Sequence, residues 1–414
     1  MSGIDILEHG GNEYKRLVNN AKWTLASLNW ALRFDESNIV EMERHNLTDE
    51  TFVLLCGEAT LLIGERTERV KMEPMKYYNV RAGIWHHIVV SKDARVLVAE
   101  NADTSKDNTD YLLLATNRIY NKRPSFEEVL PDIYLLKVPF GPVWTGIILV
   151  KGEKNILIDS SHLEPEKYLI PALADLGIKP GDISWLLNTH VHGDHIGGHY
   201  ALATRYGIRT ATLKSTAEAL LDPVKVAIRV RTRFPKNSPA PQSYLKGVKP
   251  DKVLDEGELL EGRFYAVETP GHDEDCLTWI DTRTGTAISG DSIQGNGTVT
   301  QGIAFYRSLP AYKRSLEKLE GMDLQNLVCG HDYDGIGYMV KGRKAVSAAL
   351  KYCDDRTELY ERKIKEYLTE GVPVEEEPVT IARKLIGEVG CGMPDSLFLA
   401  LHTVSEHLKR MDNQ

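Results

Sequence analysis

Four residues near the middle of the chain have the side-chain types that hold transition metals. His190, His192, Asp194 and His195 lie within six residues, in the stretch NTHVHGDHIGGH. Three imidazoles and a carboxylate at this spacing turn several lone-pair donors towards one point, which suits zinc or a similar metal. Because the 414 residues include only 13 histidines, we interpret the cluster as a metal site and not as a loop that happens to be rich in histidine.

The flanking segments indicate how this cluster is positioned. Residues 183–187 (ISWLL) are a short apolar run with the length of a buried strand, which ends just before the first histidine. After the cluster, residues 199–206 have the composition of a helix that Gly207 closes. The sequence therefore predicts ligands at a strand-to-helix junction, where a rigid scaffold holds them open to solvent.

Length and composition limit the class of protein. A chain of 414 residues predicts two or three domains. With 42% hydrophobic and 26% charged residues and a net charge of −9, a general affinity for the nucleic acid backbone is not expected. The first residues, MSGIDILEHGGNEYKR, lack the basic start and apolar run of a secretory signal. We expect a cytoplasmic protein that acts on a small molecule, without membrane or nucleic acid partners.

Residues 1–108 predict a separate all-β unit. Strand-like runs at 51–56, 60–63 and 88–90 are separated by glycines, with no long helical period between them. Short strands with glycine turns are typical of a sandwich or barrel.

Two stretches of this unit resemble a known family. The segments HNLTDETFVLLCGEATLLIG (His45–Gly64) and YNVRAGIWHHIVV (Tyr78–Val90) resemble the two motifs of a small cupin barrel. The resemblance implies a site for iron, manganese or zinc, although a glutamate stands at the position of the family's first histidine. Because of that departure, the favoured alternative is a metal-free barrel that serves as a binding pocket or as a module for forming a homodimer. The implied ligands are Glu43, His45, Glu50 and His86.

Residues 109–340 predict a second unit with mixed α/β layers. Strand-like runs at 133–138, 146–150 and 155–158 precede an expected helix at 164–176 and the strand that leads into the histidine cluster. Four apolar runs are each followed by a residue that can bind or orient a metal ligand. A single histidine after a strand is more often a hydrogen-bonded residue, but the order of these four is informative. They are Asp159 after 155–158, His272 after 264–268, Asp291 after 286–289 and His331 after 327–328.

Together with the H-x-H-x-D-H cluster, these residues resemble the motif series of the metallo-β-lactamase superfamily. The resemblance implies an αβ/βα sandwich, in which two mixed sheets lie face to face with helices outside. It also implies hydrolysis and not oxygen reduction, because His192 stands where the flavodiiron branch has a glutamate. The implied sites are one metal at His190, His192 and His272 and another at Asp194, His195 and His331, with Asp291 bridging them and Asp159 orienting ligand imidazoles.

The implied chemistry is hydrolysis by two divalent metal ions, with zinc expected and iron or manganese as alternatives. Ions roughly 3.5 to 4 Å apart can hold a bridging hydroxide at neutral pH, and Asp194 could accept its proton. The predicted substrate has an ester, lactone or thioester bond. The alternatives are an RNA nuclease or phosphodiesterase that uses the same metals, and a cupin-centred enzyme or binding protein.

Two local features bear on the substrate. The acidic tripeptide Asp273-Glu274-Asp275 follows His272, and we interpret it as a cap for the next turn, with tuning of the metals as the alternative. The basic segment 222–251 is an outlier in an acidic protein. If residues 227–234 form a strand, three arginines project from one face and hold an anionic substrate; otherwise they belong to a solvated surface. These arginines are Arg229, Arg231 and Arg233.

Residues 341–414 predict a helical C-terminal segment. The candidate helices are 344–352, 355–368 and 379–389. Several hydrolases of the superfamily carry such a segment beside the active site, and some of them act on RNA. The acidic helices here argue against a nucleic acid track.

Overall fold

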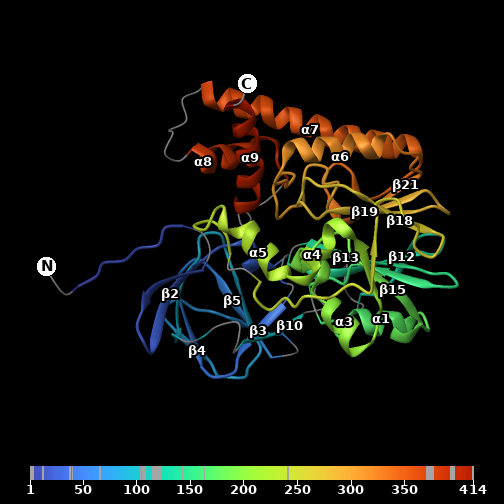
Figure 1. Cartoon of the computed structure of the whole chain (residues 1–414). Helices are drawn as coiled ribbons and strands as arrows, with labels where there is room; N and C mark the ends of the chain where they lie inside the picture. Colours follow the sequence, from blue (N-terminus) through green and yellow to red (C-terminus); the bar gives the residue numbers. More distant parts are fainter. Residues whose placement is uncertain are drawn as a thin grey trace. The chain divides into compact units, whose positions relative to one another are not determined.

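The computed structural model of the chain describes residues 4–412, except 12–13, 37–38, 40, 65–66, 103, 105–108, 114–123, 142, 163, 240–241, 370–376 and 392–396. The chain divides into two compact units, unit 1 (residues 1–123) and unit 2 (residues 124–414), which Figure 1 colours along the sequence. Among the described residues, no helix is both long enough and apolar enough to cross a bilayer.

Unit 1 consists of two five-stranded sheets with an apolar core between them. Phe52 and Val96 of one sheet and Leu61 and Ile88 of the other belong to this core. The strands expected at 51–56, 60–63 and 88–90 are confirmed. Each sheet has two free edges, so the closed barrel expected from the cupin resemblance is not formed. In spatial order, the strands of the first sheet are β1 (Tyr14–Asn19), β2 (Trp23–Asn29), β9 (Arg95–Asn101), β4 (Glu50–Cys56) and β7 (Tyr77–Val80). The strands of the second sheet are β10 (Thr109–Leu113), β3 (Glu41–His45), β8 (His86–Val90), β5 (Ala59–Ile63) and β6 (Glu68–Lys71).

Strand β10 lies beyond the boundary expected at residue 108. It pairs with β3 in an antiparallel register in which Thr109 lies opposite His45. Unit 1 therefore continues at least to Leu113, and the division into three domains at 108 and 340 stays a prediction.

Unit 2 contains the two facing mixed sheets of the predicted αβ/βα sandwich. Strands β14, β15, β16 and β17 run parallel to one another, and the runs in β14 and β15 are apolar on both faces, as expected for buried parallel strands. The first sheet is β11 (Glu127–Leu130), β12 (Ile133–Phe140), β13 (Val143–Val150), β14 (Asn155–Ile158), β15 (Ile183–Leu187), β16 (Thr210–Leu213), β17 (Lys252–Leu254), and the second is β18 (Phe264–Glu268), β19 (Leu277–Asp281), β20 (Thr286–Gly290), β21 (Asn326–Tyr333), β22 (Gly337–Lys341).

Three apolar layers hold unit 2 together. Ile158 and Leu187 of the first sheet pack with Trp279 and Val328 of the second, which fills the space between the sheets. A second layer covers the outer face of the first sheet, and a third joins the second sheet to the C-terminal helices, which lie together in Figure 1. The helices are α1 (Leu169–Asp175), α2 (Gly193–Ile196), α3 (His199–Arg205), α4 (Lys214–Leu221), α5 (Pro223–Thr232), α6 (Leu309–Glu320), α7 (Arg343–Thr369), α8 (Glu377–Val389) and α9 (Leu397–Asp412).

The helical C-terminal segment is confirmed, with one correction. The two helices expected at 344–352 and 355–368 are a single helix, α7. The residues between them, Cys353 and Asp354, include no glycine or proline that would break the helix, and Cys353 is buried in the same core as Tyr360. The helix at 379–389 is present as α8.

Candidate metal centre

The seven candidate ligands come from separate segments of unit 2 that meet at the ends of its strands. The first two histidines follow β15, and the next pair lies in the short helix α2, which confirms the predicted strand-to-helix junction. One ligand each follows β18 and β20, whereas the last lies inside β21 and not after a strand end. In this order they are His190, His192, Asp194, His195, His272, Asp291 and His331.

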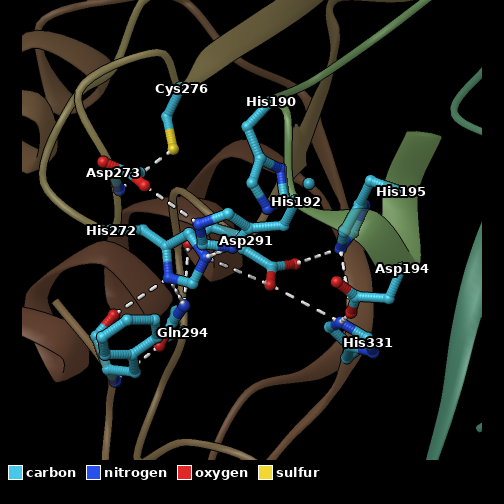
Figure 2. Close-up of polar contacts among 12 residues, drawn as sticks. His190, His192, Asp194, His195, His272, Asp273, Cys276, Asp291, Gln294 and His331 are labelled. Carbon is cyan, nitrogen blue, oxygen red and sulfur yellow. Dashed lines mark hydrogen bonds and ion pairs between the residues drawn. The ribbon is translucent and has the colours of Figure 1, made fainter. Parts of the chain in front are cut away.

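The structure brings these residues together as two groups of donors. The ligand atoms within each group lie within 4.8 Å of one another. Asp291 belongs to the second group and reaches the first, since its Oδ2 is 3.6 Å from His272 Nε2, while its Oδ1 is 3.2 Å from His195 Nε2. Figure 2 shows this carboxylate between the two groups. The groups are His190, His192, His272 and Asp194, His195, Asp291, His331.

Close backbone contacts fix the two segments beside Asp291. Gly290 has a φ of 50°, and a Cβ there would lie 2.2 Å from Thr189 Oγ1. A Cβ on Gly330 would lie 2.6 Å from Asp291 Oδ1 and 2.7 Å from His195 Cε1. Only glycine fits these positions, because a side chain at 290 would collide with Thr189 and one at 330 with Asp291 and His195.

Hydrogen bonds to the ring nitrogen that faces away from the centre orient two of the ligand histidines. His195 Nδ1 lies 2.8 Å from Asp159 Oδ2, and His331 Nδ1 lies 2.6 Å from the Trp144 carbonyl oxygen. Such contacts fix the ring orientation and leave Nε2 directed at the centre. The contact of Asp159 agrees with the role expected for it. No sequence pattern predicts the contact with the carbonyl of Trp144, because a backbone acceptor does not depend on residue type.

Two histidines of the first group are in the neutral state that a metal ion requires. Burial lowers the pKa of His190 well below its usual range and that of His272 to about 4, so both imidazoles are neutral. Burial opposes ionisation of Asp291, but the charges of His331 and His195 outweigh it and hold the pKa of this carboxyl well below its usual range. Among the described residues, His190 Nε2 is buried without a hydrogen-bond partner, whereas His195 Nε2 and Asp291 Oδ1 contact each other at 3.2 Å. Because unpartnered buried polar atoms are costly, the residues present fit bound cations.

A cavity of about 340 Å³ opens on these donors. Asp194 lies at its floor, with 18% of its side chain exposed. Among the described residues that line the cavity, Arg231 is the one charged side chain outside the ligand groups. The wall is otherwise mostly apolar and includes Phe140, Val143, Val230, Phe305, Phe398 and Leu399.

The strand expected at residues 227–234 is wrong. The segment lies in helix α5, which begins at Pro223 with Asp222 as its N-cap, whose Oδ1 accepts a hydrogen bond from the Lys225 amide at 3.1 Å. The alternation of arginine with β-branched residues predicted a strand, but the cap and the proline nucleate a helix. Arg229 and Arg233, four residues apart, therefore lie towards one side of the helix and Arg231 towards the other, so the three arginines do not form one positive face.

Each arginine has a different environment. Arg229 binds Asp273 Oδ1 at 2.8 Å, and Arg233 binds Glu406 Oε1 at 3.0 Å. Arg231 lines the cavity, and its only described hydrogen bond is from Nη1 to a carbonyl oxygen of its own helix at 3.2 Å. Of the three predicted substrate-binding arginines, only Arg231 is placed to contact a substrate.

The acidic tripeptide is more than a cap. The Glu274 amide does donate to Asp273 Oδ1 at 2.8 Å, as expected for a turn. However, Asp273 Oδ2 also lies 3.0 Å from His192 Nε2, and Asp275 Oδ2 accepts a hydrogen bond from the Val191 amide at 2.7 Å. Both aspartates thus contact the segment that carries the first two ligands.

Unit 1 contains the four residues implied by the cupin resemblance, and they lie close together. The ligand atoms of Glu43, His45, Glu50 and His86 are within 4.8 Å of one another. They line a cavity of about 210 Å³. Glu50 Oε2 lies between the two histidines, 3.2 Å from His45 Nε2 and 2.8 Å from His86 Nε2.

Curated relatives match less than half of this chain. The uncharacterized protein YobT of Bacillus subtilis is 32% identical over 159 residues, which are 36% of this chain and 63% of that protein. A hydroxyacylglutathione hydrolase of Chelativorans is 28% identical over 194 residues, 45% of this chain and 62% of that protein. The chain thus covers less than two thirds of the length of these relatives.

Family and fold comparisons agree with the observed architecture. A metallo-beta-lactamase family protein of Thermus thermophilus superposes with a TM-score of 0.51 at 20% identity, covering 69% of this chain and 95% of that chain. This similarity confirms the predicted αβ/βα fold. The profile described as Metallo-beta-lactamase superfamily matches residues 138–331, so this part of the chain is a metallo-beta-lactamase superfamily domain.

Proposed function

We propose that unit 2 is a metal-dependent hydrolase that binds two divalent metal ions, preferably zinc, and cleaves an ester, lactone or thioester of a small molecule. One observation carries this proposal: two groups of buried donors share Asp291 and open on one cavity. The first group would hold one ion and the second group the other. When bound, such ions supply a water molecule of lowered pKa and an electrophile for the substrate oxygen.

The remaining steps fall to side chains of the chain itself. Asp194 is a ligand and faces the cavity, so it can also take the proton from the attacking water. The apolar wall, including Phe305 and Phe398, excludes bulk water and strengthens the electrostatic interactions within the site. No serine or cysteine nucleophile is needed for this chemistry.

The cavity favours an acyl substrate that carries an anionic group. Arg231 offers a guanidinium fork to a carboxylate or phosphate, which replaces the expected set of three arginines. The relative named hydroxyacylglutathione hydrolase supports an acyl bond as the one cleaved. An RNA substrate is less consistent with the site, because two arginines of α5 are bound to acidic residues and unavailable to phosphates.

Turnover by the zinc-loaded protein tests this proposal. The substrates are a panel of thioesters, lactones, phosphodiesters and a mixed RNA pool. We expect hydrolysis of at least one thioester or lactone, lost with a chelator and restored by zinc. Cleavage restricted to RNA or phosphodiesters would assign the protein to the alternative class, and absence of turnover with two zinc ions bound would contradict the proposal.

A further inference from the structure

Asp273 is a buried carboxylate in the loop that follows β18. Its side chain is 0% exposed, although it directly follows a candidate ligand. It touches a second candidate ligand from another segment, because its Oδ2 lies 3.0 Å from His192 Nε2. Figure 2 shows Asp273 reaching towards this ring from the side opposite Asp291.

Two arginines hold this carboxylate in place. Its Oδ1 accepts hydrogen bonds from Arg229 of α5 at 2.8 Å and from Arg307, which precedes α6. A buried carboxylate without partners would cost several kcal/mol, so the pair of guanidinium groups stabilises its ionised form. The carboxylate is thereby fixed from two segments that lie far apart in the sequence, helix α5 and the residue before the N-cap of α6.

The position of Asp273 decides which nitrogen of His192 faces the donors. Since Nε2 contacts the carboxylate, Nε2 carries the proton, and Nδ1 is left with a lone pair. His192 Nδ1 lies 3.0 Å from His272 Nε2, inside the three-histidine group. In His195 and His331 the two nitrogens have the opposite roles: Nδ1 contacts an acceptor outside the donor group and Nε2 faces the other donors. His192 therefore requires an acceptor at Nε2, and Asp273 provides it.

Asp275 holds the backbone of the same segment. Its Oδ2 accepts from the Val191 amide at 2.7 Å, and its own carbonyl accepts from Thr216 Oγ1 at 3.0 Å. Asp275 thus fixes the main chain at Val191, and Asp273 separately fixes the ring of His192. The side chain of the third member of the acidic tripeptide, Glu274, is 72% exposed, and its one ion pair among the described residues is with Arg229.

We propose that Asp273 is a positioning residue which, held by Arg229 and Arg307, fixes the tautomer and orientation of His192 so that Nδ1 binds the metal of the three-histidine group. The inference rests on the proposed metal centre but not on the reaction it performs. An acceptor that orients a ligand histidine typically changes metal affinity by about 10–100-fold. Loss of the Asp273 carboxylate should therefore weaken one of two metal sites.

The test compares Asp273→Asn with Glu274→Gln in the full-length protein. Chelator competition measures the two zinc affinities, and the visible absorption spectrum of the cobalt-substituted protein reports ligand geometry. For Asp273→Asn we expect one zinc affinity to fall about 10–100-fold and the cobalt bands to change. The matched control, Glu274→Gln, removes an exposed charge that contacts the same Arg229. It should leave both zinc affinities within about twofold of wild type.

The same substitution in a His192→Ala protein distinguishes a positioning role of Asp273 from a general loss of protein stability. In His192→Ala protein, Asp273→Asn should cause no further loss of zinc affinity, because the ring on which it acts is gone. An equal loss with and without His192, or wild-type affinity and spectrum in a folded Asp273→Asn protein, would overturn the proposal. If Asp273→Asn does not fold, Arg307→Gln provides the same comparison with the carboxylate retained but less firmly held. Zinc binding without hydrolysis in the wild-type protein would contradict the proposed function and leave this inference intact.

Discussion

The two units each contain a buried cluster of histidines and acids, but the clusters differ in what their donor atoms already contact. In unit 1, Glu50 lies between the Nε2 atoms of His45 and His86, and both rings are hydrogen-bonded to it. In unit 2, His190 Nε2 is buried without a hydrogen bond among the described residues. The first cluster satisfies its histidines internally, whereas the second leaves a buried histidine nitrogen without a described partner.

The protonation of the histidines differs within unit 2 as well as between the two units. Burial lowers the pKa of His45 and His86, but the hydrogen bond and charge of Glu50 outweigh burial and raise both pKa values above the usual range. In unit 2, burial keeps His190 neutral, whereas the neighbouring carboxylates outweigh burial and raise the pKa of His195 well above its usual range and that of His331 to about 10. A protonated imidazole has no lone pair to offer, so a metal ion would displace protons from the histidines that face carboxylates in both units, whereas His190 needs no such release.

Removal of the shared carboxylate should have the largest effect. We expect two zinc ions in unit 2, and Asp291→Ala should lose at least one of them and about 10³-fold or more in kcat/KM, because this residue reaches both donor groups. Elemental analysis after loading with excess zinc measures this. Asp332→Ala, an exposed site next to a ligand on β21, should retain both ions. One zinc or fewer in the wild-type protein would contradict a dinuclear site.

Buried histidines of α9 in unit 2 and the histidines of the unit 1 cluster should change the stability of the protein in opposite directions when the pH is lowered. Burial lowers the pKa of His402 and of His407 to about 3. Since the unfolded pKa is about 6.5, each contributes stability that is present above pH 6.5 and lost as pH falls towards 3. At pH 5 the loss is about 2 kcal/mol per histidine. The raised pKa values of unit 1 have the opposite sign, because their contribution is retained below pH 6.5.

Melting temperatures at pH 8 and pH 5 check this prediction. The variant His407→Phe should lose less stability on acidification than wild type, by about 2 kcal/mol, even though it also loses the contact with Tyr306. The same pH dependence in both proteins would show that His407 is not responsible.

An arginine that lines each cavity has a different set of partners in the two units. Arg16, which lines the cavity of unit 1, is paired with Glu100 at 2.9 Å, whereas Arg231 has no carboxylate partner within ion-pair distance among the described residues. Arg231→Gln should raise KM about tenfold for an anionic substrate, or about 1.4 kcal/mol, and much less for a neutral analogue. Added salt should narrow the difference.

A matched variant of the same helix serves as the control. Arg233→Gln removes an arginine that binds Glu406, and it should leave the ratio of KM values for the two substrates unchanged. Equal effects of Arg231→Gln on both substrates would exclude a role for this residue in recognising charge.

The smallest effect is expected in the cluster of unit 1. His86→Ala breaks the contact with Glu50, yet turnover should stay within a few-fold of wild type, because hydrolysis depends on unit 2. The initial rate on the best substrate measures this. A loss beyond about 100-fold, or about 2.7 kcal/mol, in a folded protein would show that unit 1 takes part in catalysis.

The sequence by itself determined the strands and the ligands that follow them. The runs at 155–158, 183–187 and 264–268 form β14, β15 and β18 with the expected bounds. Short apolar runs ended by polar residues are local signals, and a ligand next in sequence to a strand end is fixed in space by that strand. These local signals predicted the cluster at residues 190–195. The full set of seven candidate ligands was implied by the resemblance to the superfamily's motif series and stays a prediction, and His331 lies inside β21 instead of after a strand end.

Only the tertiary structure decided what the charged residues do. The segment 227–234 satisfied a strand pattern, but Val226 and Val230 are buried on one side of a helix, and that packing placed Arg231 in the cavity while Arg229 reached Asp273. The role of Asp273 depends on His192, 81 residues away. Ion pairs and ring contacts between distant segments leave no local pattern, because they follow from how the chain packs and not from which residues are neighbours in sequence.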